Sequence, residues 1–240
     1  MKIVVLLSGG VDSSTCLAVA LQDAQPDEVL AVNMYYGQKH EREMRSARDI
    51  AAYYGVELME LDLSAIFAKS DCSLLSGSNK AIPHESYAEQ QKRTNGGPVS
   101  TYVPFRNGLM LSAAASIAVS VGADHVYYGA HADDAAGNAY PDCSVPFTEA
   151  MNRAIYEGTG GKVNIIAPFV TFNKAQVVKT GMKLGVPYER TWSCYEGGER
   201  PCGECGTCID RKKAFEANGQ TDPLQYLERR VGNTHEKNQF

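Results

Sequence analysis

The segment from residue 3 to residue 14 reads Ile-Val-Val-Leu-Leu-Ser-Gly-Gly-Val-Asp-Ser-Ser, and it decides the fold class. Residues 3–7 are apolar without interruption, which is typical of a strand buried on both faces of a parallel sheet. The glycines predict a turn, and a helix is expected over residues 13–21. A helix that begins directly after such a turn points its first amide groups at whatever binds there. This stretch therefore predicts an α/β domain with an anion site beyond its first strand.

The same alternation of strand and helix continues along the chain. The apolar patterns predict strands over residues 29–35, 56–63, 125–129 and 162–169, and helices over residues 41–54, 108–121, 148–156 and 209–217. This order predicts a doubly wound, Rossmann-like and mostly parallel sheet. Ligands of such sheets bind beyond the carboxyl ends of the strands.

Two stretches depart from the alternation: residues 67–103, and the segment rich in cysteine and glycine over residues 192–208. Residues 67–103 are rich in Ser, Asn, Gly and Pro without sustained periodicity, so we expect a lid or substrate loop there. We expect the α/β domain to occupy residues 1–190 and a small appendage to occupy residues 191–240. The polar tail over residues 229–240 is expected to fray.

The composition is that of a water-soluble globular protein. Of 240 residues, 44% are hydrophobic and 21% are charged, and no apolar run approaches the length of about 20 residues that a membrane span needs. The N-terminus does not resemble an export signal. The net charge of −5 favours a small-molecule substrate over direct nucleic-acid binding, because nucleic-acid sites are usually basic. Seven cysteines, four of them crowded near the C-terminus, indicate metal-bound thiolates in the reducing cytoplasm.

The glycine turn carries the groups that a phosphate site needs. Gly9 and Gly10 let the backbone approach a phosphate closely, and Asp12 either caps the helix or holds Mg²⁺. The hydroxyl donors of the turn are Ser8, Ser13 and Ser14. The turn lacks both the Gly-Lys-Ser/Thr ending of a Walker A motif and the GxGxxG spacing of a dinucleotide fold. The alternative is an ordinary glycine-rich turn with a Ser or Asp cap.

Four cysteines have the spacing of a metal site. They are Cys194, Cys202, Cys205 and Cys208. The paired C-x-x-C spacing lets four thiolates surround one tetrahedral ion, and a closed shell without histidine suits structural Zn²⁺. An iron–sulfur cluster uses the same ligands, and a disulfide or free thiols are the remaining alternatives.

The string SGGVDS over residues 8–13 resembles the pyrophosphate-binding loop of the PP-loop ATP pyrophosphatases, which have an adenine nucleotide alpha hydrolase-like fold. These enzymes convert ATP to AMP and pyrophosphate while they adenylate a carbonyl, amide or carboxylate oxygen. Further strings occur in order: YGQKH over residues 36–40, VPFRN over 103–107, YPDC over 140–143, TWSCY over 191–195 and CGECGTC over 202–208. Together they resemble the 7-cyano-7-deazaguanine synthase family of the queuosine pathway over residues 3–215.

The resemblance implies an ATP-dependent carbon–nitrogen ligase. Its substrates would be ATP with Mg²⁺, ammonia and 7-carboxy-7-deazaguanine, its product the 7-cyano compound, and it would bind one Zn²⁺. Adenylation of the carboxylate supplies a leaving group for ammonia, and adenylation of the resulting amide then permits formation of the nitrile. We also expect a cytoplasmic homodimer that contacts neither nucleic acid nor membrane.

These inferences define the candidate site residues. The expected catalytic residues are Ser8, Asp12, Ser13, Arg106 and Asp142. The expected nucleotide-binding residues are Leu7, Ser8, Gly9, Gly10, Val11, Asp12, Ser13, Ser14, Thr15, Cys16, Leu17 and His40. The expected substrate-binding residues are Arg106, Asn107, Tyr140, Asp142 and Trp192. Arg106 would pair with the substrate carboxylate or a phosphate, and Asp142 would accept hydrogen bonds from the guanine-like edge.

Some features leave alternatives open. Trp192 either stacks on a flat base or packs beside the metal site, and His40 either contacts ATP or caps a helix. Ser144 and residues 131–138 depart from the family wording, which leaves base recognition open. The rival enzyme is a PP-loop tRNA sulfur transferase in which Cys143 or Cys72 carries a persulfide. A nucleotide-binding module without catalysis is the non-enzymatic alternative.

Overall fold

The sheet has five parallel strands, as the sequence predicts. The structure is a computed structural model that describes residues 2–227. The strands are β1 (Ile3–Leu6), β2 (Val29–Tyr35), β3 (Glu57–Asp62), β4 (His125–Tyr127) and β5 (Asn164–Ile166). Their order is β3-β2-β1-β4-β5, and every pairing is parallel. Because the connections run outward in both directions from β1, the strand order reverses between β1 and β4.

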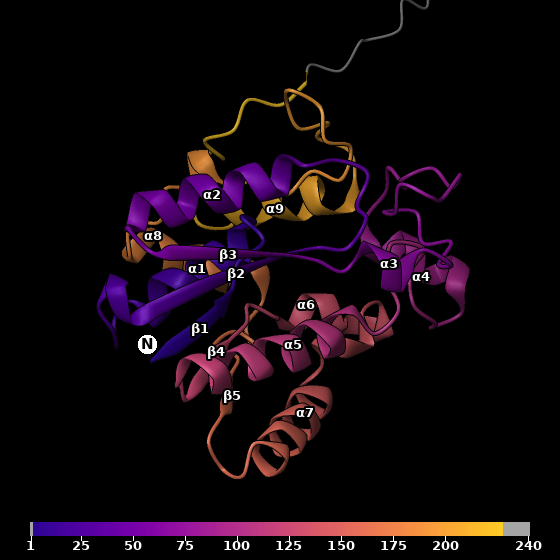
Figure 1. Ribbon diagram of the computed structural model, residues 1–240. Coiled ribbons are helices and arrows are strands. Elements are labelled where there is room, and N and C mark those ends of the chain that lie inside the picture. The colour runs from indigo at the N-terminus through magenta and orange to yellow at the C-terminus, as the bar shows by residue number, and fades with distance from the viewer. Residues whose placement is uncertain (1, 228–240) are drawn as a thin grey trace, which may run out of the picture.

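Successive residues of the central strands enter two different cores. Ile3 and Val5 of β1 pack with the helices on one face, whereas Val4 packs with those on the other. This alternation follows from the two-residue period of a strand. Figure 1 shows α2 (Arg42–Tyr54) and α8 (Lys174–Lys183) on one side of the sheet, and α5 (Arg106–Val121) and α7 (Val145–Gly158) on the other. The doubly wound fold class is therefore confirmed.

Most predicted helices are present with shifted ends. The remaining α-helices are α1 (Val11–Ala20), α3 (Ser64–Phe67), α4 (Tyr87–Thr94), α6 (Ala132–Ala135) and α9 (Gly206–Glu216). α1 begins two residues earlier than predicted, so the helix starts inside the glycine turn. Strands β4 and β5 are shorter than predicted because their apolar runs continue into the loops at the carboxyl edge.

Four of the α-helices within residues 2–227 were not predicted: the short α3 and α6, and the longer α4 and α8. α8 begins at Lys174 after the cap Asn173, whose side chain accepts a hydrogen bond from the amide of Gln176. α4 lies inside residues 67–103, which we expected to be a loop without regular structure, and Ser86 and Glu89 form a capping box at its start. The extended part of the same segment pairs with the chain after β2 through an isolated bridge between Gln38 and Leu75.

The C-terminal segment packs onto the sheet domain. Phe215 of α9 is buried in the same cluster as Val11 of α1, and Trp192 and Cys205 share a cluster with Tyr36 after β2. No helix within residues 2–227 is long and apolar enough to cross a membrane. The tail at residues 229–240, where we expected fraying, lies outside the described residues.

Candidate active site

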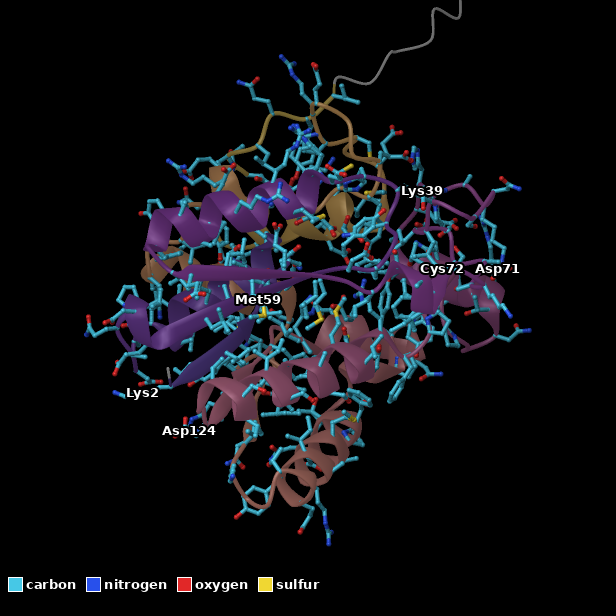
Figure 2. The ribbon with its side chains drawn as sticks, in the orientation of Figure 1. Lys2, Lys39, Met59, Asp71, Cys72 and Asp124 are labelled. Carbon is cyan, nitrogen blue, oxygen red and sulfur yellow. The ribbon has the colours of Figure 1, made fainter. Side chains whose placement is uncertain are left out.

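A cavity lies at the carboxyl ends of β1, β2 and β4. In Figure 2, Lys2 and Asp124 lie next to the amino ends of β1 and β4, whereas Lys39 and Cys72 lie toward the opposite edge. The cavity walls come from the loop between β1 and α1, the ends of β2 and β4, the first residues of α5 and α8, and the chain around Trp192. The cavity therefore adjoins the point at which the strand order reverses, where α/β sheets bind their ligands.

The loop between β1 and α1 is held by its own hydroxyl groups and by α2. The Oγ atoms of Ser8 and Ser13 lie 3.0 Å apart, and the amide of Ser8 donates to Ser13 Oγ over 3.2 Å. Gly9 has a φ of 83°, and a Cβ at this position would lie 2.4 Å from the amide nitrogen of Ala47. Only glycine permits both this conformation and this approach. The turn is therefore fixed against α2 beside the cavity.

The start of α1 offers unsatisfied polar groups to a ligand. The first amides of any helix have no partner within the helix, and here they lie at the cavity. Asp12 Oδ1 and Ser14 Oγ are buried, and neither has a hydrogen-bond partner among residues 2–227. Buried groups of this kind are uncommon unless a ligand or water satisfies them. A phosphate fits the helix start, and a divalent cation fits the free oxygen of Asp12.

Lys174 brings a positive charge to the same end of the cavity. Its Nζ forms an ion pair with Asp12 Oδ2 and lies 3.4 Å from His131 Nε2. His131 is buried, and its Nε2 lies 3.3 Å from a carboxylate oxygen of Asp134. Burial alone would raise the pKa of Asp12, but Lys174 and His131 outweigh it and hold that pKa below its ordinary value. Asp12 is therefore ionised, and the cluster contains both the charge for a phosphate and the carboxylate for its cation.

Arg106 occupies a different wall of the cavity. Its Nη1 donates to Tyr36 Oη over 3.2 Å, and its guanidinium lies 5.0 Å from the centre of the Tyr36 ring. This ring contact supports the guanidinium from one side. Glu43, from the first turn of α2, lines the same part of the cavity. An anionic ligand group in the cavity can therefore pair with Arg106.

Asp142 holds the start of α5 and does not line the cavity. Its Oδ2 accepts a hydrogen bond of 2.9 Å from the amide of Asn107, and the Asn107 side chain donates to the carbonyl oxygen of Asp142 over 3.1 Å. Asn107 also donates to Cys143 Sγ over 3.2 Å. Burial raises the pKa of the Cys143 thiol well above its ordinary value, so Cys143 is a neutral thiol at the cavity. These bonds hold the start of α5, and the direct contact of Asp142 with the substrate stays a prediction.

Aromatic side chains form the remaining wall. Tyr195 Oη lies 2.9 Å from Tyr87 Oη and 3.4 Å from Tyr140 Oη, so hydroxyl groups from three separate segments meet there. Trp192 is buried beside the loop, and its amide donates to the carbonyl oxygen of Gly9 over 2.9 Å. Arg42 lies over the Trp192 ring at 4.6 Å. The wall presents aromatic rings and hydroxyl groups to the cavity, which suits an aromatic heterocycle.

The structure brings together about half of the predicted site residues. Those that line the cavity are Leu7, Ser8, Gly10, Asp12, Ser13, Arg106, Asn107, Tyr140 and Trp192. Those that lie outside the lining are Gly9, Val11, Ser14, Thr15, Cys16, Leu17, His40 and Asp142. Cys16 and Leu17 are fully buried in the core under the loop, so they support α1 instead of contacting a ligand. His40 lines a separate hollow with Arg42 and Gly197.

Sequence reasoning missed several cavity residues. They are Glu43, His131, Asp134, Lys174 and Asp210. The sequence contains a signal for His131 and Asp134: they follow the predicted strand at residues 125–129, and ligands of such sheets bind beyond the carboxyl ends of the strands. No local signal marks Lys174, because it lies far along the chain from the glycine loop that it contacts.

The four predicted metal ligands converge on one point. The sulfur atoms of Cys194, Cys202, Cys205 and Cys208 all lie within 4.8 Å of one another. Bonds of about 2.3 Å to a tetrahedral zinc ion place sulfurs about 3.8 Å apart, and Cys202 and Cys208 are 3.9 Å apart. Backbone amides also point at the sulfurs: Cys202 donates to Cys194 Sγ over 3.3 Å and Cys205 donates to Cys202 Sγ over 3.3 Å. These contacts favour thiolates, and the donor set is compatible with Zn²⁺.

Comparison with known proteins identifies one family. The model of the family described as queuosine biosynthesis protein QueC matches residues 2–219. A 7-cyano-7-deazaguanine synthase of Archaeoglobus fulgidus is 45% identical, and the match covers 93% of this chain and 90% of the relative. The synthase of Thermoplasma acidophilum is 43% identical, with 94% and 92% covered. That of Oceanobacillus iheyensis is 40% identical, with 94% and 98% covered.

Proposed function

Since this chain belongs to the queuosine biosynthesis protein QueC family, we propose that it is a 7-cyano-7-deazaguanine synthase that uses ATP to convert 7-carboxy-7-deazaguanine and ammonia to the nitrile. Family membership over nearly the whole chain carries this proposal. The cavity supports it, because it combines a candidate phosphate site, the guanidinium of Arg106 and aromatic side chains. The alternative of a tRNA sulfur transferase is not favoured.

ATP fits at the end of the cavity formed by the loop between β1 and α1. The amides at the start of α1, the hydroxyls of Ser8 and Ser13, and Lys174 would contact the phosphates. The Mg²⁺ that accompanies ATP would bind the free oxygen of Asp12. When the phosphates bind, Lys174 can shift part of its contact from Asp12 to a phosphate oxygen.

The deazaguanine substrate fits between Arg106 and the aromatic wall. Arg106 would pair with its carboxylate, and Trp192, Tyr140 and Tyr195 would flank the ring. The carboxylate oxygen attacks the α-phosphorus of ATP and pyrophosphate leaves, which gives an acyl adenylate. Ammonia then attacks the acyl carbon and AMP leaves, so the product is an amide. A second ATP adenylates the amide oxygen, and loss of AMP and protons from the nitrogen leaves the nitrile.

The cysteine site would have a structural role in this chemistry. A bound Zn²⁺ would be held by all four thiolates, which leaves no position for a substrate, so its role would be to fold the segment that carries Trp192 and Tyr195. We further propose that the protein acts in the cytoplasm as a homodimer and does not bind nucleic acid directly.

The test is a mass-spectrometric assay of the purified protein. With 7-carboxy-7-deazaguanine, ammonium, Mg²⁺ and ATP, we expect the amide to appear first and the nitrile to follow, with ATP converted to AMP and pyrophosphate. The control omits ammonium, in which case neither product forms. Absence of both products from a folded, zinc-loaded preparation would refute the assignment, and ADP as the nucleotide product would refute the adenylation chemistry.

A further inference from the structure

Glu43 is a carboxylate of the cavity wall that the chemistry above does not use. It lies in the first turn of α2, directly against the phosphate loop, because its carbonyl oxygen is only 2.7 Å from the position that a Cβ on Gly9 would take. Its side chain lines the cavity together with Arg106 and Tyr36. The packing of α2 on the loop therefore places Glu43 in the cavity wall.

The Glu43 carboxylate has no partner of its own. Within residues 2–227 its side chain forms no hydrogen bond and no ion pair, although Arg106 and Tyr36 are close enough to interact with it electrostatically. Arg42 donates to the carbonyl oxygen of Glu199 and stacks on Trp192. Arg106 donates to Tyr36. A carboxylate that faces a cavity without a partner is available to a cationic or hydrogen-donating ligand.

The charged and titratable groups that face Glu43 come from two elements. Arg106 is on α5, and Tyr36 follows β2. Burial raises the pKa of Glu43 to about 7, and the nearby positive charge of Arg106 only partly opposes the rise. A group with this pKa exchanges a proton readily at neutral pH, which is the property that a general base needs.

The synthase reaction requires such a base. Ammonium in neutral solution is almost entirely protonated and has no lone pair, whereas the nucleophile must be free ammonia. From the position of its unpaired carboxylate beside Arg106, we infer that Glu43 binds ammonium in the cavity and removes one proton from it, next to the acyl carbon that ammonia attacks. This inference rests on the proposed synthase function.

The protons of this step balance. Ammonium gives one proton to the Glu43 carboxylate, and the nitrogen lone pair forms the C–N bond as the carbonyl π electrons move to oxygen, which gives a tetrahedral adduct. The carbon–oxygen bond to AMP breaks when this adduct collapses. The second proton leaves the nitrogen when the tetrahedral adduct collapses, and it is released to solvent with AMP. Glu43 returns its own proton to solvent before the next ammonium binds.

The test compares two nucleophiles in Glu43→Gln. With ammonium at pH 7, we expect amide formation to fall by about 10²- to 10⁴-fold, the usual contribution of general acid–base catalysis. Hydroxylamine is largely unprotonated at this pH, so hydroxamate formation should stay within about threefold of the wild-type rate. ATP–pyrophosphate exchange without any nucleophile should likewise be kept, which also shows that the variant is folded. Glu41→Gln, an exposed carboxylate two residues away, is the matched control.

The pH profile gives a second readout. The wild-type rate at fixed total ammonium should rise up to about pH 7 and then level off, since Glu43 is ionised above its pKa. In Glu43→Gln the rate should instead keep rising about tenfold per pH unit toward pH 9, because it follows free ammonia.

An unchanged rate with ammonium, or an equal loss with hydroxylamine, would overturn the inference. A raised KM for the deazaguanine alone would also overturn it. Failure of the wild-type protein with both nucleophiles would instead refute the synthase assignment.

Discussion

The loop between β1 and α1 contains no basic residue, so Lys174 supplies the positive charge at the phosphate end of the cavity. Walker-type loops carry their own lysine for this purpose. Here the lysine comes from α8, which lies far along the chain from the loop. Its ion pair with Asp12 holds its side chain at the loop. Its pKa is raised, since the attraction of Asp12 outweighs the lowering effect of burial, and Lys174 therefore stays charged.

We predict that Lys174→Met removes adenylation while the deazaguanine still binds. Methionine keeps the length of the side chain without its charge, and loss of one preorganised electrostatic contact typically lowers kcat by about 10²- to 10³-fold. ATP–pyrophosphate exchange measures the adenylation step, and calorimetric titration measures binding of the deazaguanine. Lys179→Met on the exposed face of the same helix should leave both unchanged. A Lys174→Met protein with wild-type exchange would show that Lys174 does not contact the phosphates.

The two glycines of the loop differ in how closely a neighbouring segment packs against them. Gly9 meets the backbone of α2, whereas a Cβ on Gly10 would lie 3.4 Å from the carbonyl oxygen of Trp192, which is ordinary contact. The φ of Gly10 is −81°, a value that alanine adopts freely. Alanine substitutions at Gly9 and at Gly10 therefore separate the effect of packing against α2 from the effect of adding a methyl group.

We predict that Gly9→Ala destabilises the protein and that Gly10→Ala does not. The positive φ and the collision with Ala47 together should cost about 2 kcal/mol or more, which lowers Tm by about 5 °C for a chain of this length. Thermal unfolding followed by circular dichroism measures the difference, and Gly10→Ala should stay within about 2 °C of wild type. Equal melting temperatures for the two variants would show that the loop does not depend on α2.

Helices and strands can be predicted from the sequence where the residues that specify them are neighbours in the chain. The strand at residues 29–35 is predicted with its observed ends: Glu28 precedes it, and a glycine follows it at residue 37. α8 is missed because its apolar stripe is short. The places of Glu43 and Lys174 in the cavity wall are missed because they depend on contacts between distant segments. The glycine loop and the four cysteines are found because each motif carries its chemistry within a few residues.

For the molecule as a whole, the cysteine site and the cavity form one unit. Tyr195 directly follows Cys194, a predicted metal ligand, and contacts Tyr87 of α4, so the cysteine segment also meets the segment over residues 67–103. Thr207, which lies between the ligands Cys205 and Cys208, donates to the carbonyl oxygen of Ser193 over 2.6 Å. Metal binding should therefore organise the wall of the cavity as well as its own loop.

We predict that Cys205→Ser lowers metal content, stability and substrate affinity together. Metal binding by a closed site is folding free energy, and its loss should lower Tm by about 10 °C, equivalent to about 3 kcal/mol for a chain of this length. KM for the deazaguanine should rise more than KM for ATP, because Trp192 and Tyr195 line the substrate side. Cys72→Ser, a buried cysteine outside the site, should keep the metal. Elemental analysis with thermal unfolding and steady-state kinetics checks the three effects. A metal-free protein with unchanged KM values would show that the cavity forms independently of the cysteine site.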